Sequence, residues 1–142
     1  MARDHLTRSE AETEGFGERL ARELRPESVV YLFGRLGAGK TALARGLARG
    51  LGAPAREVAS PTFAILNEYA SDSGGVVLRH LDLYRLKDEE KDLEVLGLPG
   101  AVSGAPVAVE WPNATIRRLL PPTAEIEIEV LPGGERRIRR LL

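Results

Sequence analysis

The sequence predicts a single α/β domain over residues 1–142, with three layers in which helices cover a mostly parallel central sheet. Three observations lead to this fold class. Short apolar, β-rich runs alternate with helix-type segments, a glycine-rich loop lies between one such run and a helix, and the tail alternates apolar and charged residues. A chain of this length can bury one substantial core, whereas two domains would each be poorly buried.

Composition excludes several classes of protein. The formal net charge is −1, with 43% hydrophobic and 29% charged residues, which argues against bulk electrostatic binding to nucleic acid or to anionic membranes. No apolar run approaches the roughly 18 residues that a membrane span needs, and the segment "MARDHLTRSE" lacks the apolar core of a signal peptide. The chain has no cysteine, so disulfides and thiolate metal sites are excluded. We therefore expect a cytoplasmic protein without a membrane partner.

The first predicted element is a helix within residues 7–28. Ser9 and Glu12 form a capping-box pattern at its start, and Pro26 ends it. The two glycines of "EGFGE" are unfavourable in a helix interior, and they weaken this prediction.

The second predicted unit is a strand, a glycine loop and a helix in direct succession. Residues 28–33, "SVVYLF", are typical of a buried parallel strand, and residues 40–52 place leucines four apart as a helix does. Between them, Gly34, Gly39, Lys40 and Thr41 complete the pattern G-x-x-x-x-G-K-[ST]. This context predicts a P-loop NTPase-like fold, with a glycine-rich turn that merely opens a helix as the alternative.

The loop residues suit the binding of a nucleoside triphosphate. Free backbone N–H groups at a helix N-terminus attract anionic oxygens, and Gly37 and Gly39 permit backbone angles that a side chain would forbid. Together with Ala38 they predict the phosphate cradle. Lys40 is expected to contact the β- and γ-phosphates, and the Thr41 hydroxyl is expected to bind Mg²⁺. ATP and Mg²⁺ are thus the predicted cofactors.

The rest of the chain predicts further strands, two of which end near an acid. The predicted elements are a strand over residues 62–69, a strand that begins at Val76 and has Asp82 near its end, a short helix within residues 87–100, and a strand over residues 105–111 that contains Glu110.

Asp82 and Glu110 are the candidate acids of the site. Ligands of open α/β sheets bind beyond the carboxyl ends of the strands, where one acid could hold the metal and the other could orient the attacking water. The alternative for each is an ordinary surface carboxylate. His80, two residues before Asp82, is more simply interpreted as a strand residue, and Trp111 as either a partner contact or a lid on the core.

The tail predicts an antiparallel hairpin. Ile126, Ile128 and Val130 alternate with glutamates, and residues 135–142 supply arginines that suit cross-strand pairing. A solvated hairpin face is the favoured interpretation. The alternative is a nucleic-acid stripe of four arginines: Arg136, Arg137, Arg139 and Arg140.

Five motifs taken together resemble one bacterial family. "GRLGAGKT", "SPTF", "HLDLYRL", "EVLGL" and "VEW" follow one another as in the TsaE (YjeE) ATPases of tRNA threonylcarbamoyladenosine biosynthesis, over roughly residues 7 to 142. The loop motif alone is shared by many ATPases, and its combination with "SPTF" and "DLYRL" is specific. Ala42 departs from the pattern, because a second hydroxyl residue often follows Thr41 in this family.

The resemblance implies a function. Members are small ATPases that bind the TsaB–TsaD pair, and TsaD transfers a threonylcarbamoyl group to adenosine 37 of tRNA, so tRNA would be an indirect partner. By motif, Lys40 and Thr41 would bind phosphate and Mg²⁺, and Thr62 would lie near the γ-phosphate. Glu110 would join Thr41 on the metal and Asp82 would orient water, although the two acids could exchange roles.

The resemblance also raises the functional weight of Trp111, and it places the segment "LTRSE" near the base. From the residues alone, "SPT" is more simply a Ser-Pro turn.

Two other functions use the same loop. A small-molecule kinase would need a lid and an acceptor pocket, for which the chain leaves little room. A non-enzymatic nucleotide-dependent scaffold stays open as an alternative, because an ATPase that is very slow without its partners would resemble one. A regulatory GTPase would need the guanine-reading motif N-K-x-D, which the sequence lacks.

Overall fold

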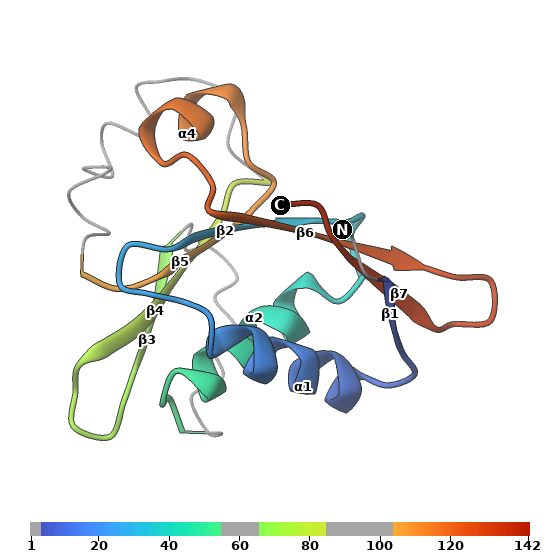
Figure 1. Ribbon diagram of the computed structural model, residues 1–142, viewed down its shortest axis with the longest axis horizontal. Coiled ribbons are helices and arrows are strands. Elements are labelled where there is room, and N and C mark those ends of the chain that lie inside the picture. Colours follow the sequence, from blue (N-terminus) through green and yellow to red (C-terminus); the bar gives the residue numbers. More distant parts are fainter. Residues whose placement is uncertain (1–3, 55–65, 85–103) are drawn as a thin grey trace.

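The computed structural model describes residues 4–54, 66–84 and 104–142, and in this part of the chain all strands join one seven-stranded sheet (Figure 1). The strand order is β1-β7-β6-β2-β5-β4-β3. In chain order the strands are β1 (Asp4–Thr7), β2 (Val29–Phe33), β3 (Leu66–Ala70), β4 (Val76–Asp82), β5 (Val107–Glu110), β6 (Ala124–Val130) and β7 (Arg136–Arg140).

The sheet is parallel in its centre and antiparallel at both ends. β6, β2, β5 and β4 form three parallel pairs, whereas β3–β4, β6–β7 and β1–β7 are antiparallel. The prediction of a mostly parallel sheet therefore holds for the centre only. β3 and β4 are antiparallel because the tight turn "SDSGG" joins them directly. The edge strand β1 was not predicted, because it is short and its residues give no alternating strand pattern.

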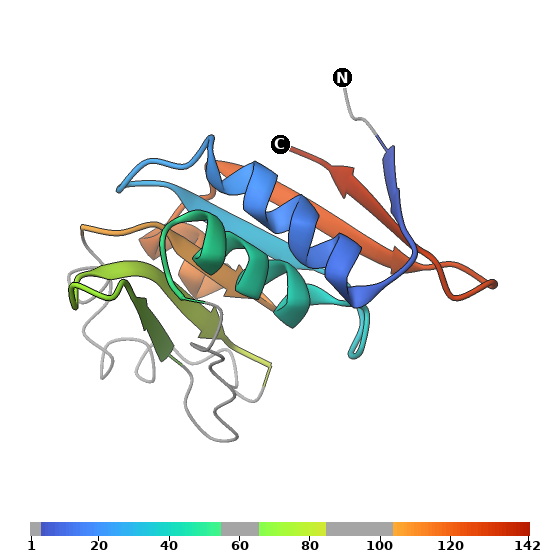
Figure 2. The ribbon, with the colours of Figure 1, turned by 90° about the horizontal axis from the view of Figure 1, so that it is seen from below.

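Helices lie on both faces of the sheet, which confirms the three-layer α/β class. α1 (Glu10–Ala21) and α2 (Lys40–Gly50) cover one face side by side, and α4 (Ala114–Leu119) lies on the other (Figures 1 and 2). None of the helices in the described ranges is long and apolar enough to cross a membrane.

The helix ends follow local chemistry. The Ser9 side chain accepts a hydrogen bond from the Glu12 N–H at 3.1 Å, as the capping box predicts. The helix stops at Ala21, several residues before Pro26, where the N–H of Arg22 bonds Arg19 in a tighter turn. The sequence did not predict α4, which has only six residues. Its N-cap is Asn113, whose side chain accepts a hydrogen bond from the Ile116 N–H.

Small residues let α1 and α2 approach at backbone distance. A Cβ added at Gly50 would lie 2.7 Å from the Glu18 carbonyl oxygen, and Cβ atoms at Gly17 and Gly46 would collide with carbonyls of the facing helix. Gly17 weakened the helix prediction because propensity counts against it, yet the helix crossing requires a residue without a side chain there.

Strand alternation sorts the core into two clusters. The cluster between the sheet and α1 and α2 contains Val30, Leu32, Ala108, Ile126 and Ile138. The cluster between the sheet and α4 contains strand residues that alternate with these, together with residues of α4 and its C-terminal end. The second cluster consists of Val29, Tyr31, Leu81, Leu83, Val107, Val109, Ile116 and Leu120.

The C-terminal hairpin of β6 and β7 is confirmed, with Glu129 opposite Arg137 and Glu127 opposite Arg139. Arg137 bonds Glu129 across the strands, as predicted. The hairpin arginines bond acids of this chain or, in one case, the glycine loop, and this supports the structural interpretation over a free nucleic-acid stripe. The other ion pairs are Arg139 with Asp4 and Glu127, and Arg140 with Glu23.

Three predictions lie outside the described residues. They are the helix within residues 87–100, the start of the strand predicted over residues 62–69, and Thr62 with its "SPT" segment.

Candidate nucleotide-binding site

A cleft of about 470 Å³ lies where β4 and β5 end and α2 begins. It brings together the loop residues Gly37, Gly39, Lys40 and Thr41 with both predicted acids. The remaining lining residues come from the start of α1, from α2 and from the C-terminal hairpin: Arg8, Ser9, Glu10, Thr13, Leu36, Ala42, Arg45, Trp111, Gly134 and Arg136.

The glycine loop has the backbone that an anion cradle requires. Gly37 and Gly39 have φ of 79° and 114°, a region that side chains rarely occupy. Gly39 is the N-cap of α2 and provides no side-chain acceptor to its first amides. The first N–H groups of the helix therefore keep their capacity to donate to an anion, and the helix dipole adds to the attraction.

Lys40 is almost completely buried, at 4% exposure. Its Nζ donates to the Gly34 carbonyl and lies 3.8 Å from the centre of the Trp111 ring. Burial lowers the pKa of Lys40 from its usual value, and the nearby Glu110 and Asp82 carboxylates offset part of this shift. The lysine is thus a cation held in a poorly solvated position, where an added phosphate would be a strong partner.

The sheet register places the two predicted acids side by side. Asp82 is the Cα partner of Glu110 on the neighbouring parallel strand, and both side chains line the cleft with Thr41. Asp82 accepts a hydrogen bond from the Tyr84 N–H at 3.0 Å, which fixes its carboxylate at the end of β4. Glu110 is buried, at 4% exposure.

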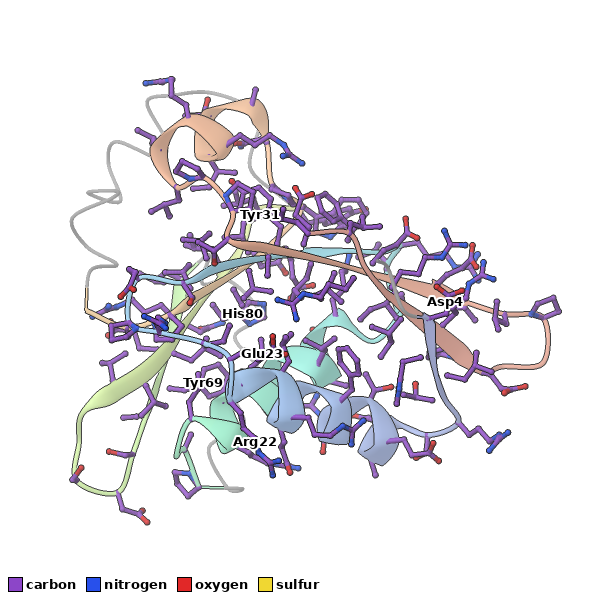
Figure 3. All side chains as sticks on the ribbon, viewed as in Figure 1. Asp4, Arg22, Glu23, Tyr31, Tyr69 and His80 are labelled. Carbon is purple, nitrogen blue, oxygen red and sulfur yellow. The ribbon has the colours of Figure 1, made fainter. Side chains whose placement is uncertain are left out.

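His80 is a site residue that the sequence interpretation treated as a plain strand residue. It is buried on the face covered by α1 and α2, opposite to that of Tyr31 (Figure 3), and its Nε2 lies 2.5 Å from Glu110 Oε2. Strand alternation was the available signal, because residues 80 and 82 must point to the same face.

Trp111 has a left-handed backbone with φ of 57°, an uncommon conformation for a bulky residue. Its ring contacts two groups: the Lys40 ammonium, a lining group of the cleft, and the Tyr84 ring, whose centroid is 5.0 Å away. Strained residues persist where their surroundings fix them, often at functional sites. Trp111 therefore does both: it lines the cleft beside Lys40, and it packs against the apolar cluster beneath α4.

The start of α1 and the residues before it also line the cleft. Arg8, Ser9 and Glu10 are among the lining residues, so the segment "LTRSE" does reach the cleft. Thr13 lines it as well and shares a 2.7 Å hydrogen bond with the buried Thr7.

The donor set suits a hard cation that shares its ligands with phosphate. Within the described ranges no group of three His, Cys, Asp or Glu residues could hold a metal alone. Thr41, Asp82 and Glu110 instead offer a hydroxyl and carboxylate oxygens beside the phosphate loop. Mg²⁺ prefers oxygen ligands, typically one or two carboxylates together with substrate phosphates.

Comparison with known proteins identifies the family. The family model described as threonylcarbamoyl adenosine biosynthesis protein TsaE matches residues 7–140. The chain belongs to the TsaE family. The tRNA threonylcarbamoyladenosine biosynthesis protein TsaE of Treponema pallidum is 40% identical over 134 residues, which cover 94% of this chain and 96% of that protein. The TsaE protein of Streptomyces coelicolor is 40% identical over 117 residues, which cover 82% and 78% of the two chains.

A solved structure resembles the whole TsaE-family domain. The crystal structure of Bacillus subtilis YdiB superposes with a TM-score of 0.70 at 30% identity, and the match covers 99% of this chain and 84% of that one. The P-loop fold predicted from the glycine motif therefore agrees with both the sheet topology and the solved relative.

Proposed function

We propose that this protein is a Mg²⁺-dependent ATPase that supports a TsaB–TsaD complex in forming threonylcarbamoyladenosine at position 37 of tRNA. The observation that carries the proposal is the convergence of Lys40, Thr41, Asp82 and Glu110 on one cleft. The names of the TsaE relatives supply the pathway, and the cleft supplies the chemistry.

The charges in the cleft suit phosphate binding. Amides of the loop and of α2 would hold the phosphate chain. Lys40 would exchange its contacts with the Gly34 carbonyl and the Trp111 ring for contacts with the terminal phosphate oxygens. Since Lys40 is already buried, it loses little further hydration on binding.

Thr41 and Glu110 would hold Mg²⁺, and Asp82 would orient the attacking water. The bond from His80 to Glu110 supports this assignment, because carboxylates that bind metals are usually oriented by a second hydrogen bond. The metal would neutralise charge that develops on the phosphate oxygens. Thr62, outside the described residues, would contact the γ-phosphate.

The partner proteins and the tRNA enter the proposal through the family. The TsaB–TsaD pair would bind this chain and stimulate its turnover, and tRNA would be bound by those partners. Hydrolysis by the isolated chain would be weak.

The test is ATP turnover measured with and without the TsaB–TsaD pair, on the unmodified protein, Lys40→Ala and Glu110→Ala. We expect stimulation by the partners and, in both variants, a loss of roughly 10²-fold or more. Arg139→Ala serves as a control on a half-exposed cation outside the cleft. Unchanged turnover in Glu110→Ala would contradict its catalytic assignment.

The two acids can be distinguished by Mg²⁺ titration of Asp82→Asn and Glu110→Gln. The variant that removes a metal ligand should need more Mg²⁺ for half-maximal activity, whereas the other should lose turnover at saturating Mg²⁺. Phosphoryl transfer to a metabolite would instead indicate a kinase. Partner binding that requires ATP but not its hydrolysis would indicate a scaffold.

A further inference from the structure

Arg136 connects the C-terminal hairpin to the glycine loop. It is the first residue of β7, some hundred positions from the loop in sequence, yet its Nε donates to the Ala38 carbonyl at 2.9 Å. Its Nη2 lies 3.4 Å from the Gly37 carbonyl, and its Nη1 donates to the Gly134 carbonyl at 2.5 Å. One guanidinium therefore links two consecutive loop carbonyls to the turn of its own hairpin.

These bonds fix the direction of loop amides. In a planar trans peptide, the C=O of one residue and the N–H of the next point in opposite directions. With the Ala38 carbonyl turned towards Arg136, the Gly39 N–H points away from the guanidinium. The Gly37–Ala38 peptide is held from both sides, because the Ala38 N–H also donates to the Arg35 carbonyl at 3.1 Å.

The loop needs such an external contact. Gly37 and Gly39 both have positive φ, and glycine loses more conformational freedom on ordering than any other residue. A nucleotide that bound a disordered loop would have to supply this ordering free energy from its own contacts.

We infer that Arg136 is a positioning residue that holds the phosphate loop in its anion-binding conformation before the nucleotide arrives. This inference rests on the proposed function and adds to it a residue that lies outside the glycine motif. The planar shape of the guanidinium is essential, because its nitrogens reach three carbonyls at once. A lysine would keep the charge but not this geometry.

The test compares Arg136→Lys and Arg136→Met with the same substitutions at Arg140. Arg140 lies on the same strand and the same face but bonds Glu23, away from the loop. Binding of Mg-ADP and Mg-ATP is measured by calorimetry, and thermal unfolding confirms that each variant is folded. We expect both Arg136 variants to bind roughly tenfold to hundredfold more weakly, as for the loss of a charged hydrogen bond, and both Arg140 variants to bind as the unmodified protein does.

A second measurement tests the loop without nucleotide. In ¹H–¹⁵N spectra of the free protein, the amide signals of Ala38 and Gly39 should shift or broaden in Arg136→Lys, while those of β2 and β5 stay in place. Wild-type affinity or unchanged loop signals in Arg136→Lys would overturn the inference. Failure of the unmodified protein to bind any nucleotide would instead contradict the proposed function, and the loop signals would still decide the role of Arg136.

Discussion

The two faces of the sheet use the same strands for different purposes. On the face covered by α1 and α2, β4 and β5 place Asp82 and Glu110 in the lining of the cleft, and buried His80 bonds Glu110. The two helices on this face touch at backbone distance through glycines. On the face covered by α4, the same strands contribute Leu81 and Val109 to an apolar cluster.

On the α4 face, the Tyr31 hydroxyl is a polar group at the end of a fully buried side chain. It donates to the Leu120 carbonyl at 2.6 Å and the Ile116 carbonyl at 3.3 Å, where the short helix ends. The Tyr31 hydroxyl thus satisfies backbone carbonyls at the end of α4, whereas Asp82 and Glu110 on the other face line the cleft. Successive residues of a strand point to opposite faces of the sheet. This alternation alone places core residues on one face and the residues of the candidate site on the other.

The close helix crossing on the cleft face should be the most sensitive point. In Gly46→Ala the new Cβ would collide with the Glu14 carbonyl oxygen and lie 2.8 Å from its carbonyl carbon. Since two backbones must separate to admit it, we expect a loss of about 4 kcal/mol or more in the free energy of unfolding. Urea denaturation measures this loss, and a change below about 1 kcal/mol would show that the helices can separate easily.

The α4 face should respond as an ordinary apolar core. Ile116 is the fully buried residue of α4, so Ile116→Ala removes apolar contacts and leaves a cavity, at a cost of about 3 kcal/mol. Nucleotide affinity should stay unchanged because the residue lies on the face away from the cleft. Denaturation and calorimetry together check both statements, and weaker nucleotide binding would contradict the separation of the two faces.

The partner of Glu110 should affect catalysis more than binding. His80→Ala removes the hydrogen bond to Glu110, and we expect kcat to fall about tenfold or more while KM for ATP changes little. His80→Gln keeps an N–H donor and should recover part of kcat. An equal loss in both variants that follows the fall in thermal stability would indicate a purely structural role.

Tyr31→Phe should lower the free energy of unfolding by about 1 to 2 kcal/mol at neutral pH, since it removes the hydroxyl that bonds the end of α4.

Burial raises the pKa of Tyr31 from 10.0 to about 12. The folded protein therefore holds this proton more tightly than the unfolded chain, and the stabilisation is complete below pH 10 and is lost as pH rises towards 12. The difference in stability between the two proteins should narrow over this range, as measured by urea denaturation. A constant difference would show that the hydroxyl titrates normally.

The smallest expected effect is a gain. A Cβ at Gly15 would meet only the end of the Arg19 side chain, at 3.8 Å. Gly15→Ala should therefore stabilise α1 by about 0.5 to 1 kcal/mol through its helix propensity. A destabilised variant would show that the two neighbouring glycines of α1, Gly15 and Gly17, are both needed for packing.

Local sequence patterns predicted those features of the fold that depend on residues close together in the chain. The glycine motif predicted the succession of strand, glycine loop and helix, and the alternating tail predicted the β6–β7 hairpin with its Glu–Arg pairs. The capping box of α1 and the positions of Asp82 and Glu110 near strand ends were also readable, because each depends on residues a few positions apart.

Other features depend on segments that the fold brings together. β1 and the short α4 have weak local patterns, and their neighbours in space stabilise them. Gly17 lowers the helix propensity of its segment, but the packing of α2 against α1 requires a residue without a side chain at this position.

The sequence by itself predicted the P-loop fold, the glycine loop before α2 and the two acids near strand ends. Only the tertiary structure decided that His80 bonds Glu110, that Trp111 covers Lys40, and that Arg136 holds the loop from the far end of the chain. The physical reason is that propensity and periodicity act over a few residues, whereas sheet register and side-chain burial join residues that are thirty to a hundred positions apart.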